Sequence, residues 1–187
     1  MNPAPNLVLV GPMGSGKSSI GRRLAERFGL AFHDADREVE AQAGASIATI
    51  FECAGEADFR AREQIVLAGL LAGEGAVIAT GGGAVLDPRT RQLLRERGFV
   101  VHLHVDVPQQ LARLARDRSR PLLAGEDRED VLRRLAEVRD PLYDDVADLR
   151  FDTAAMGAAD TAAKLGHMLD AQWRMATAEP RAGAARP

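Results

Sequence analysis

The sequence predicts an α/β fold in which helices cover both faces of a parallel sheet. Short apolar segments alternate along most of the 187 residues with segments whose apolar residues recur every three or four positions, and these patterns are typical of strands and helices respectively. The apolar segments also lack the polar positions that a strand with one exposed face would show, as in residues 7–10. Strands of this kind belong to parallel sheets buried between helical layers.

The first half of the chain begins with a strand, a loop and a helix. Residues 7–10 form a continuous apolar run, and Ile20, Leu24 and Phe28 follow at four-residue spacing. Gly29 comes next and is expected to cap this helix. The elements expected to follow are a strand over 30–33, helices over 38–43, 47–53 and 57–71, and a strand over 76–79.

The second half continues the alternation. We expect helices over 88–97, 108–116, 131–138 and 158–173, and strands over 99–105 and 149–152. Residues 117–129 combine many charges with a proline and a glycine, which predicts a mobile surface loop. Residues 174–187 offer little to bury, so we expect a single domain over 1–173 followed by a disordered tail.

Composition and charge exclude several classes of protein. Lys and Arg number 24 against 27 Asp and Glu, and the net charge of −3 argues against a broad nucleic-acid or membrane surface. The N-terminus lacks the basic segment of a secretory signal, and the longest apolar tract, residues 65–80, is interrupted by glycines and Glu74. A single cysteine, Cys53, excludes an internal disulfide framework and is expected as a packed thiol. These observations predict a cytoplasmic protein.

Residues 11–18 carry the strongest functional signal. Their sequence, GPMGSGKS, matches G-x-x-x-x-G-K-[ST] between an expected strand and an expected helix. Glycines allow backbone N–H groups to surround phosphate oxygens, Lys17 reaches the β- and γ-phosphates, and the Ser18 hydroxyl binds Mg²⁺. The motif predicts a nucleoside triphosphate site rather than a plain glycine-rich turn. The residues expected to bind the nucleotide through this loop are Gly11, Gly14, Ser15, Gly16, Lys17, Ser18 and Ser19.

Two aspartates follow the second expected strand. In extended chain the side chains of Asp34 and Asp36 leave on the same face, at the sheet edge where parallel-sheet proteins bind ligands. One carboxylate would assist the metal through water and the other would accept a hydrogen bond from a hydroxyl. A helix N-cap followed by a solvated acid is the alternative. Asp106, after the strand over 99–105, is a second candidate for the metal and equally a helix start.

Glycines and arginines supply the remaining candidates. Residues 81–83 are three successive glycines after an expected strand, which indicates either close approach of a ligand to the backbone or a plain turn. Arg60, Arg120 and Arg139 are candidates for anion contacts because guanidinium matches carboxylate and phosphate bidentately. Any one of them, taken alone, is more often a solvated surface arginine.

Taken in order, six segments resemble the shikimate kinase family. They are the phosphate loop over 11–18, DAD over 34–36, FRARE over 59–63, GGG over 81–83, RPLL over 120–123 and RDPLY over 139–143. The resemblance runs from about residue 7 to residue 169, and its specificity comes from the occurrence of all six segments in this order. It implies a three-layer α/β/α fold of the nucleoside monophosphate kinase type, with a five-stranded parallel sheet and a mobile lid over about 115–128.

The resemblance also implies an activity. The γ-phosphoryl group of ATP would pass to the 3-hydroxyl of shikimate, giving shikimate 3-phosphate and ADP in the shikimate pathway to chorismate and aromatic amino acids. ATP is then a co-substrate, and one Mg²⁺ per subunit is the cofactor. The partners are shikimate and ATP alone, with no nucleic acid and no membrane, and the protein is a monomer.

Site roles are carried over on matching positions. Lys17, Asp34 and Arg120 would be catalytic, with Arg120 closing from the lid onto the transferring phosphate and also binding ATP. Ser18 and, through water, Asp34 would hold the metal. The residues implied to bind shikimate are Asp36, Arg60, Gly82 and Arg139, with Glu63 orienting Arg60 and with support from Gly81 and Gly83. Arg113 would stack on adenine, although Arg116 and Arg118 are close alternatives.

Two other functions compete with this one. A gluconate kinase or an adenylate kinase of the same architecture would share the phosphate loop. A nucleotide switch of the GTPase kind is excluded, because its guanine motif needs an asparagine and Asn2 and Asn6 both precede the first strand.

Overall fold

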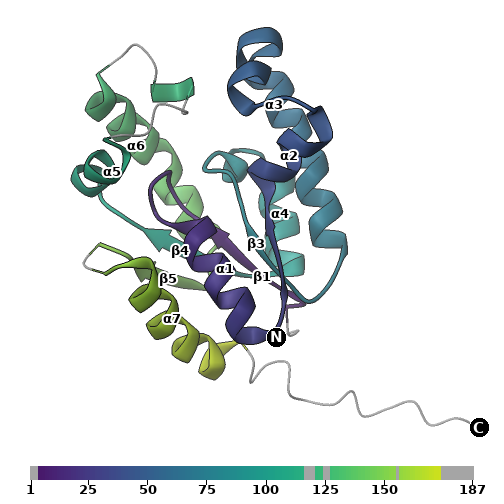
Figure 1. Ribbon diagram of the computed structural model, residues 1–187, viewed down its shortest axis with the longest axis vertical. Helices are drawn as coiled ribbons and strands as arrows, with labels where there is room; N and C mark the ends of the chain where they lie inside the picture. Colours follow the sequence, from purple (N-terminus) through teal and green to yellow (C-terminus); the bar gives the residue numbers. More distant parts are fainter. Residues whose placement is uncertain (1–3, 116–120, 124–126, 155, 174–187) are drawn as a thin grey trace, which may run out of the picture.

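The computed structural model describes residues 4–115, 121–123, 127–154 and 156–173 and shows a five-stranded parallel sheet between two helical layers (Figure 1). The strand order is β2-β3-β1-β4-β5, with all neighbours parallel. The strands are β1 (Asn6–Val10), β2 (Ala31–Asp34), β3 (Ala76–Ala79), β4 (Gly98–His104) and β5 (Leu149–Asp152). The helices are α1 (Lys17–Phe28), α2 (Ala35–Ala43), α3 (Ile47–Ala72), α4 (Pro88–Arg97), α5 (Val107–Leu114), α6 (Arg128–Val146) and α7 (Ala158–Gln172), with 3₁₀ turns η1 (Ala84–Leu86) and η2 (Pro121–Leu123).

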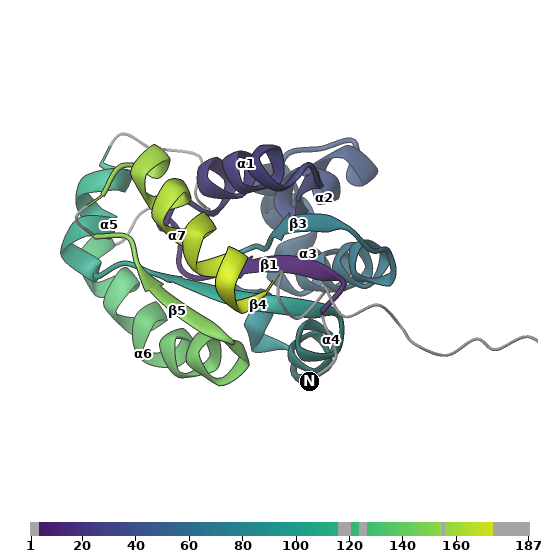
Figure 2. The same ribbon diagram turned by 90° about the horizontal axis from the view of Figure 1, so that it is seen from below.

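Central strand β1 is buried on both faces, as its apolar run predicts. Leu7 and Leu9 pack with α1 and α7 on one side of the sheet, whereas Val8 and Val10 pack with α3, α4 and α6 on the other. Figure 2 shows α1 and α7 on one face and α4 and α6 on the opposite face. The predicted α/β class and parallel sheet are confirmed.

Helix α6 is longer than the expected segment over 131–138. It begins after Asp127, whose side chain accepts hydrogen bonds from the backbone N–H groups of Glu129 and Asp130. It then continues through Pro141 to Val146. Proline removes a backbone hydrogen bond inside a helix, but Tyr143 and Val146 are buried beyond it, and their packing outweighs that loss.

The geometry around the two aspartates differs from the prediction. Helix α2 begins at Ala35, so Asp34 ends β2 while Asp36 lies in the first helical turn. The expectation that both side chains leave an extended chain was therefore wrong. Helix α3 contains both helices expected over 47–53 and 57–71 and joins them at Gly55, whose φ of 81° is the left-handed region that glycine tolerates.

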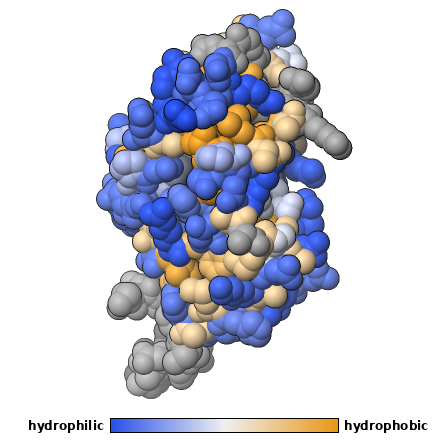
Figure 3. Space-filling view, turned by 90° about the vertical axis from the view of Figure 1, so that its left-hand side faces the viewer, coloured by the Kyte–Doolittle hydropathy of each residue, from blue (hydrophilic) through white to orange (hydrophobic). Residues whose placement is uncertain are grey.

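Cys53 corrects a second expectation. Its side chain is exposed, because on this turn of α3 Ile50 is the residue that packs into the core. In the part of the chain that the structure describes, no helix is long and apolar enough to cross a membrane. Figure 3, seen from the left of Figure 1, shows hydrophilic residues over most of that face with smaller hydrophobic patches among them.

Candidate active site

A cavity of about 650 Å³ lies at the carboxyl ends of β1, β2 and β3. The phosphate loop forms one side, α2 and α3 form another, and Arg139 of α6 also reaches it. The sequence-predicted residues that line it are Gly14, Gly16, Lys17, Ser18, Ser19, Asp34, Asp36, Arg60, Glu63, Gly81, Gly82, Gly83 and Arg139. Segments far apart in sequence therefore converge on one space.

The phosphate loop takes a shape that its glycines permit. Gly11 has a φ of 141° and passes so close to the carbonyl of Leu103 that a Cβ there would overlap it. Gly16 has a φ of 92° and immediately precedes α1. The loop thus ends at a helix N-terminus, where backbone N–H groups without helical partners favour an anion.

Lys17 lies over this loop. Its Nζ donates to the carbonyls of Gly11 and Pro12, each at 2.8 Å, and to the Ser15 hydroxyl at 3.4 Å. These contacts hold the ammonium group in the cavity wall beside Ser18. A phosphate in the loop would therefore meet a fixed positive charge.

Asp34 differs from the other aspartates at helix starts. Asp87, Asp106 and Asp127 each accept a hydrogen bond from a backbone N–H of the helix that they precede. Asp34 also precedes a helix, but its side chain makes no capping hydrogen bond and lines the cavity. The N-cap interpretation thus describes Asp106, while the carboxylate of Asp34 is directed to the site.

The three glycines over 81–83 leave space for charged side chains of the cavity. A Cβ on Gly81 would overlap Glu63, and a Cβ on Gly83 would overlap the guanidinium of Arg60. Gly83 has a φ of −101°, which any residue can adopt, so space and not backbone conformation requires glycine there. Gly82 accepts a hydrogen bond at its carbonyl from the Tyr143 hydroxyl. The segment therefore packs directly against the charged groups of the cavity.

Arg60 is held by two carboxylates on its own helix. Its Nη1 donates to Glu63 at 2.7 Å, and its Nε and Nη2 donate to Glu56 at 3.2 and 2.9 Å. Burial acts to lower the pKa of Arg60, but the two carboxylates together raise it above its ordinary value. Arg60 therefore stays charged and fixed in direction at the cavity wall.

Glu63 is the buried member of this group. Burial raises its pKa above the ordinary value, against the opposing effect of the Arg60 guanidinium. Its second oxygen, Oε1, is buried and has no hydrogen-bond partner among the described residues. That oxygen faces Gly81, so the glycine segment covers an acceptor atom that has no hydrogen bond within the described part of the chain.

Arg139 is buried to 6% exposure, an unusual position for a charged side chain. Its Nη1 lies 3.6 Å from the position that a Cβ of Gly82 would take. Tyr143, one turn further along α6, is fully buried, and burial raises the pKa of its hydroxyl well above the ordinary value. The hydroxyl therefore stays protonated and donates to Gly82. The RDPLY segment contained Tyr143, but nothing in its spacing indicated this contact.

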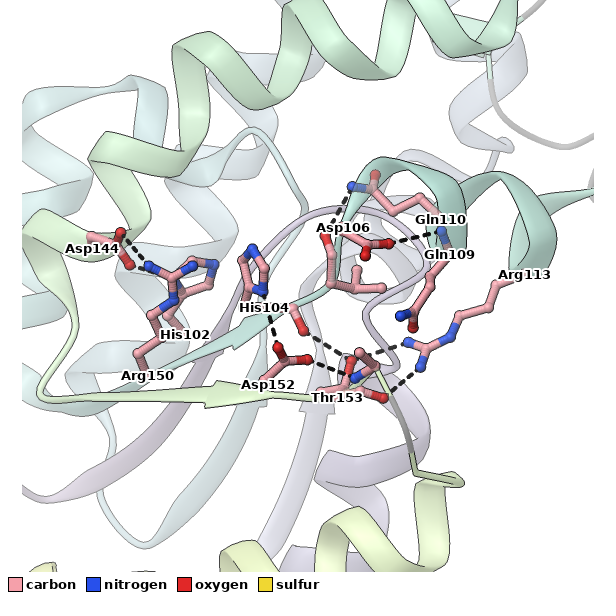
Figure 4. Close-up of polar contacts among 12 residues, drawn as sticks. His102, His104, Asp106, Gln109, Gln110, Arg113, Asp144, Arg150, Asp152 and Thr153 are labelled. Atoms are coloured by element: carbon pink, nitrogen blue, oxygen red, sulfur yellow. Dashed lines mark hydrogen bonds and ion pairs between the residues drawn. The ribbon is translucent and has the colours of Figure 1, made fainter.

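Arg113 does not line the cavity. Its guanidinium donates to the carbonyl of Gly14 at 3.0 Å and to the carbonyl and hydroxyl of Thr153 at 2.6 and 3.1 Å. Figure 4 shows the side chain reaching from α5 to Thr153. Arg113 thereby ties the phosphate loop to the segment after β5. Arg120, Arg116 and Arg118 lie outside the described residues.

Comparisons with known proteins agree with this geometry. A family model described as shikimate kinase matches residues 13–170. A shikimate kinase from Xanthomonas campestris pv. campestris is 59% identical over 177 residues, which cover 95% of this chain and 98% of that protein. A shikimate kinase from Stenotrophomonas maltophilia is 58% identical and covers 93% of this chain and 97% of its own length. The solved structure of a shikimate kinase from Acinetobacter baumannii in complex with shikimate aligns with a TM-score of 0.86 at 46% identity, covering 90% of this chain and 95% of that one.

Proposed function

The chain belongs to the shikimate kinase family, and we propose that its cavity holds ATP and shikimate side by side while the γ-phosphoryl group passes to the 3-hydroxyl of shikimate. The activity is that of an ATP-dependent phosphotransferase of the shikimate pathway, and the products are shikimate 3-phosphate and ADP. The observation that carries the proposal is the convergence of a phosphate loop and two fixed arginines, Arg60 and Arg139, on one cavity.

The nucleotide side of the reaction depends on positioning and charge. In phosphoryl transfer the protein orients the reactants and stabilises negative charge that spreads over the phosphoryl oxygens. Backbone N–H groups of the phosphate loop and of the first turn of α1 would surround the phosphates, and Lys17 is held over the same loop by the carbonyls of Gly11 and Pro12. Arg113, held by Gly14 and Thr153, keeps the loop in place and offers a guanidinium face to adenine.

The donor set fits a magnesium ion. Ser18 and Asp34 bring oxygen atoms to the cavity wall, and Mg²⁺ prefers a few protein oxygens together with phosphate oxygens and water. Among the described residues, no group of three or more His, Cys, Asp or Glu forms a metal cage. Ser18 would bind one Mg²⁺ per subunit directly and Asp34 through water. When bound, the ion neutralises charge on the phosphates.

The acceptor side matches an anionic polyol. Arg60 and Arg139 come from α3 and α6 and both reach the cavity wall, where they would clamp the carboxylate of shikimate. Asp36 and the backbone of Gly82 would bind its hydroxyls, and Glu63 would hold Arg60 in direction. No residue is assigned as a general base.

A lid completes the proposed site. We assign it to about 115–128, where Leu122 already lines the cavity. Arg120 would close onto the transferring phosphoryl group, and closure would exclude water as a competing acceptor. The protein is proposed to act as a cytoplasmic monomer with one kinase domain over 1–173.

Calorimetry with the two ligands titrated separately tests the proposal. Truncating one partner of a buried charge pair weakens binding by about 2 to 5 kcal/mol, so Arg139→Ala and Asp36→Asn should each weaken shikimate binding by roughly thirtyfold or more. ATP affinity should change little in either variant. Equal loss of both affinities would show that these residues support the fold or the nucleotide instead.

A further inference from the structure

Glu56 binds the edge of the Arg60 guanidinium group that best fits a carboxylate. Its Oε1 accepts from both Nε and Nη2 of Arg60, at 3.2 and 2.9 Å. These two N–H groups form one of the parallel edges with which guanidinium binds carboxylate bidentately. Glu63 uses Nη1 instead. An incoming carboxylate that approached this edge would meet Glu56 first.

We propose that Glu56 tunes substrate affinity through Arg60: it competes with the substrate carboxylate for this guanidinium group and yields to it on binding. The proposal rests on the proposed function, in which Arg60 binds that carboxylate. Glu56 does not line the cavity and is not assigned any contact with substrate. It acts through Arg60, as an internal carboxylate that the ligand must replace.

Burial decides which of the two glutamates yields. The side chain of Glu56 is 47% exposed, whereas that of Glu63 is 3% exposed. A released Glu56 returns to water at low free-energy cost, but a released Glu63 would leave a buried carboxylate without its partner. Glu56 also follows Gly55, the break in α3, so its backbone belongs to the start of a helical segment rather than to a packed interior.

The balance of charges around Arg60 favours release of Glu56 when a carboxylate binds. Three carboxylates lie near the two arginines. Glu56 and Glu63 pair with Arg60, and Asp36 lines the same cavity as Arg60 and Arg139. A substrate carboxylate would add a fourth negative charge, and departure of Glu56 from Arg60 restores the earlier balance.

This exchange affects only one class of acceptor. A polyol that carries a carboxylate can replace Glu56 at the two-donor edge, because it offers the same chemistry. A neutral polyol leaves the ion pair between Glu56 and Arg60 intact and gains no contact with that edge. Glu56 therefore lowers the affinity of anionic ligands, which must displace it from Arg60, and leaves the affinity of neutral polyols unchanged.

Calorimetric titration of shikimate and of its methyl ester tests the proposal on Glu56→Gln and Glu56→Ala. Partly exposed ion pairs contribute up to about 1 kcal/mol, so each variant should bind shikimate about three- to fivefold more tightly. Binding of the ester should not change. Asp58→Asn is the matched control, because Asp58 pairs with Arg62 in the same i, i+4 geometry on the same helix and Arg62 does not line the cavity.

The outcomes separate this inference from the proposed function. Unchanged or weaker shikimate binding in both Glu56 variants would overturn it, as would equal tightening of shikimate and ester or equal tightening in Asp58→Asn. Arg60→Ala in the same titrations tests the premise, because loss of the clamp should weaken shikimate binding. If Arg60→Ala has no effect, the acceptor site itself is misassigned; if it weakens binding and the Glu56 variants do not tighten it, only the competition is wrong.

Discussion

A buried histidine, His102, lies behind the acceptor side of the cavity. Its ring centroid lies 5.1 Å from that of Tyr143, the residue that donates to Gly82, with the two rings tilted by 37°. Its Nδ1 contacts Asp144 at 2.7 Å, and its Nε2 is buried without a hydrogen-bond partner among the described residues. The charged or titratable groups around it include His104, Asp144 and Arg150, which Figure 4 shows. Asp140 and Tyr143 also lie near it.

This histidine makes stability depend on pH. Burial lowers the pKa of His102 below its ordinary value of 6.5, although Asp144 opposes the shift. The unfolded chain therefore binds the proton more readily than the folded chain, and stability is lost as pH falls through 6.5 towards the folded pKa. Asp140 has a pKa raised mainly by burial, which acts in the opposite direction at lower pH.

We predict that the free energy of unfolding falls between about pH 7 and about pH 5, and that His102→Gln reduces this dependence. Glutamine keeps a polar side chain of similar reach but does not titrate. Urea denaturation of both proteins across this interval gives the slope of the free energy of unfolding against pH. The difference between the two slopes isolates His102, because the other titrating groups contribute equally to both. Parallel curves would show that His102 does not contribute.

At the scale of elements, the starts of helices distinguish the aspartates that cap a helix from Asp34, which lines the cavity. Asp106 caps α5 through the backbone N–H of Gln109 at 2.9 Å, whereas Asp34 precedes α2 without such a bond. Since a capping side chain contributes about 1 kcal/mol to stability, its loss should be visible in unfolding rather than in catalysis.

The expected result is that Asp34→Asn raises the Mg²⁺ concentration needed for half-maximal activity several-fold more than Asp106→Asn does. Asp106→Ala should instead lower the free energy of unfolding by about 1 kcal/mol. A magnesium titration of the kinase rate, together with thermal unfolding, makes both comparisons. The reverse ranking would assign the metal to the end of β4.

Much of this arrangement of elements could be predicted from the sequence, and particular residues show where prediction stopped. The phosphate loop and the residues that match family motifs were identified because their chemistry is local or ordered along the chain. The contact between Glu56 and Arg60 was not identified, since an i, i+4 ion pair is common on exposed helices and only the fold places Arg60 at the cavity. Continuation of α6 through Pro141 likewise depends on tertiary packing, which overrides local preference.

At the scale of the whole molecule, Trp173 after α7 binds the segment that precedes β1. Trp173 is 4% exposed, packs edge-on against Phe28 at 5.8 Å, and donates from Nε1 to the carbonyl of Ala4 at 3.0 Å. Ala4 stands just before β1, the strand that leads into the phosphate loop. The last described residue is thus coupled to the element that positions the nucleotide.

Two truncations test the predicted domain boundary. Removal of 174–187 should leave the melting temperature and kinase rate unchanged, because the domain prediction ends at residue 173. Removal of 173–187 should lower the free energy of unfolding by about 3 to 5 kcal/mol, as expected when a buried tryptophan is lost. Calorimetric melting of both proteins decides it, and destabilisation by the shorter deletion would extend the domain into the tail.

The strand order has a consequence for synthesis of the protein. Strand β1 is translated before the other strands, yet the strands that pair with it lie far along the sequence. Leu7 pairs with Val77 of β3 and with Phe99 of β4. The nascent chain must therefore carry β1 with both edges unpaired until β3 has been translated, and with one edge unpaired until β4 has been translated. Such long-range pairing slows folding and leaves strands open to aggregation, so the central strand that leads into the phosphate loop is also the segment whose late pairing exposes the nascent chain to aggregation.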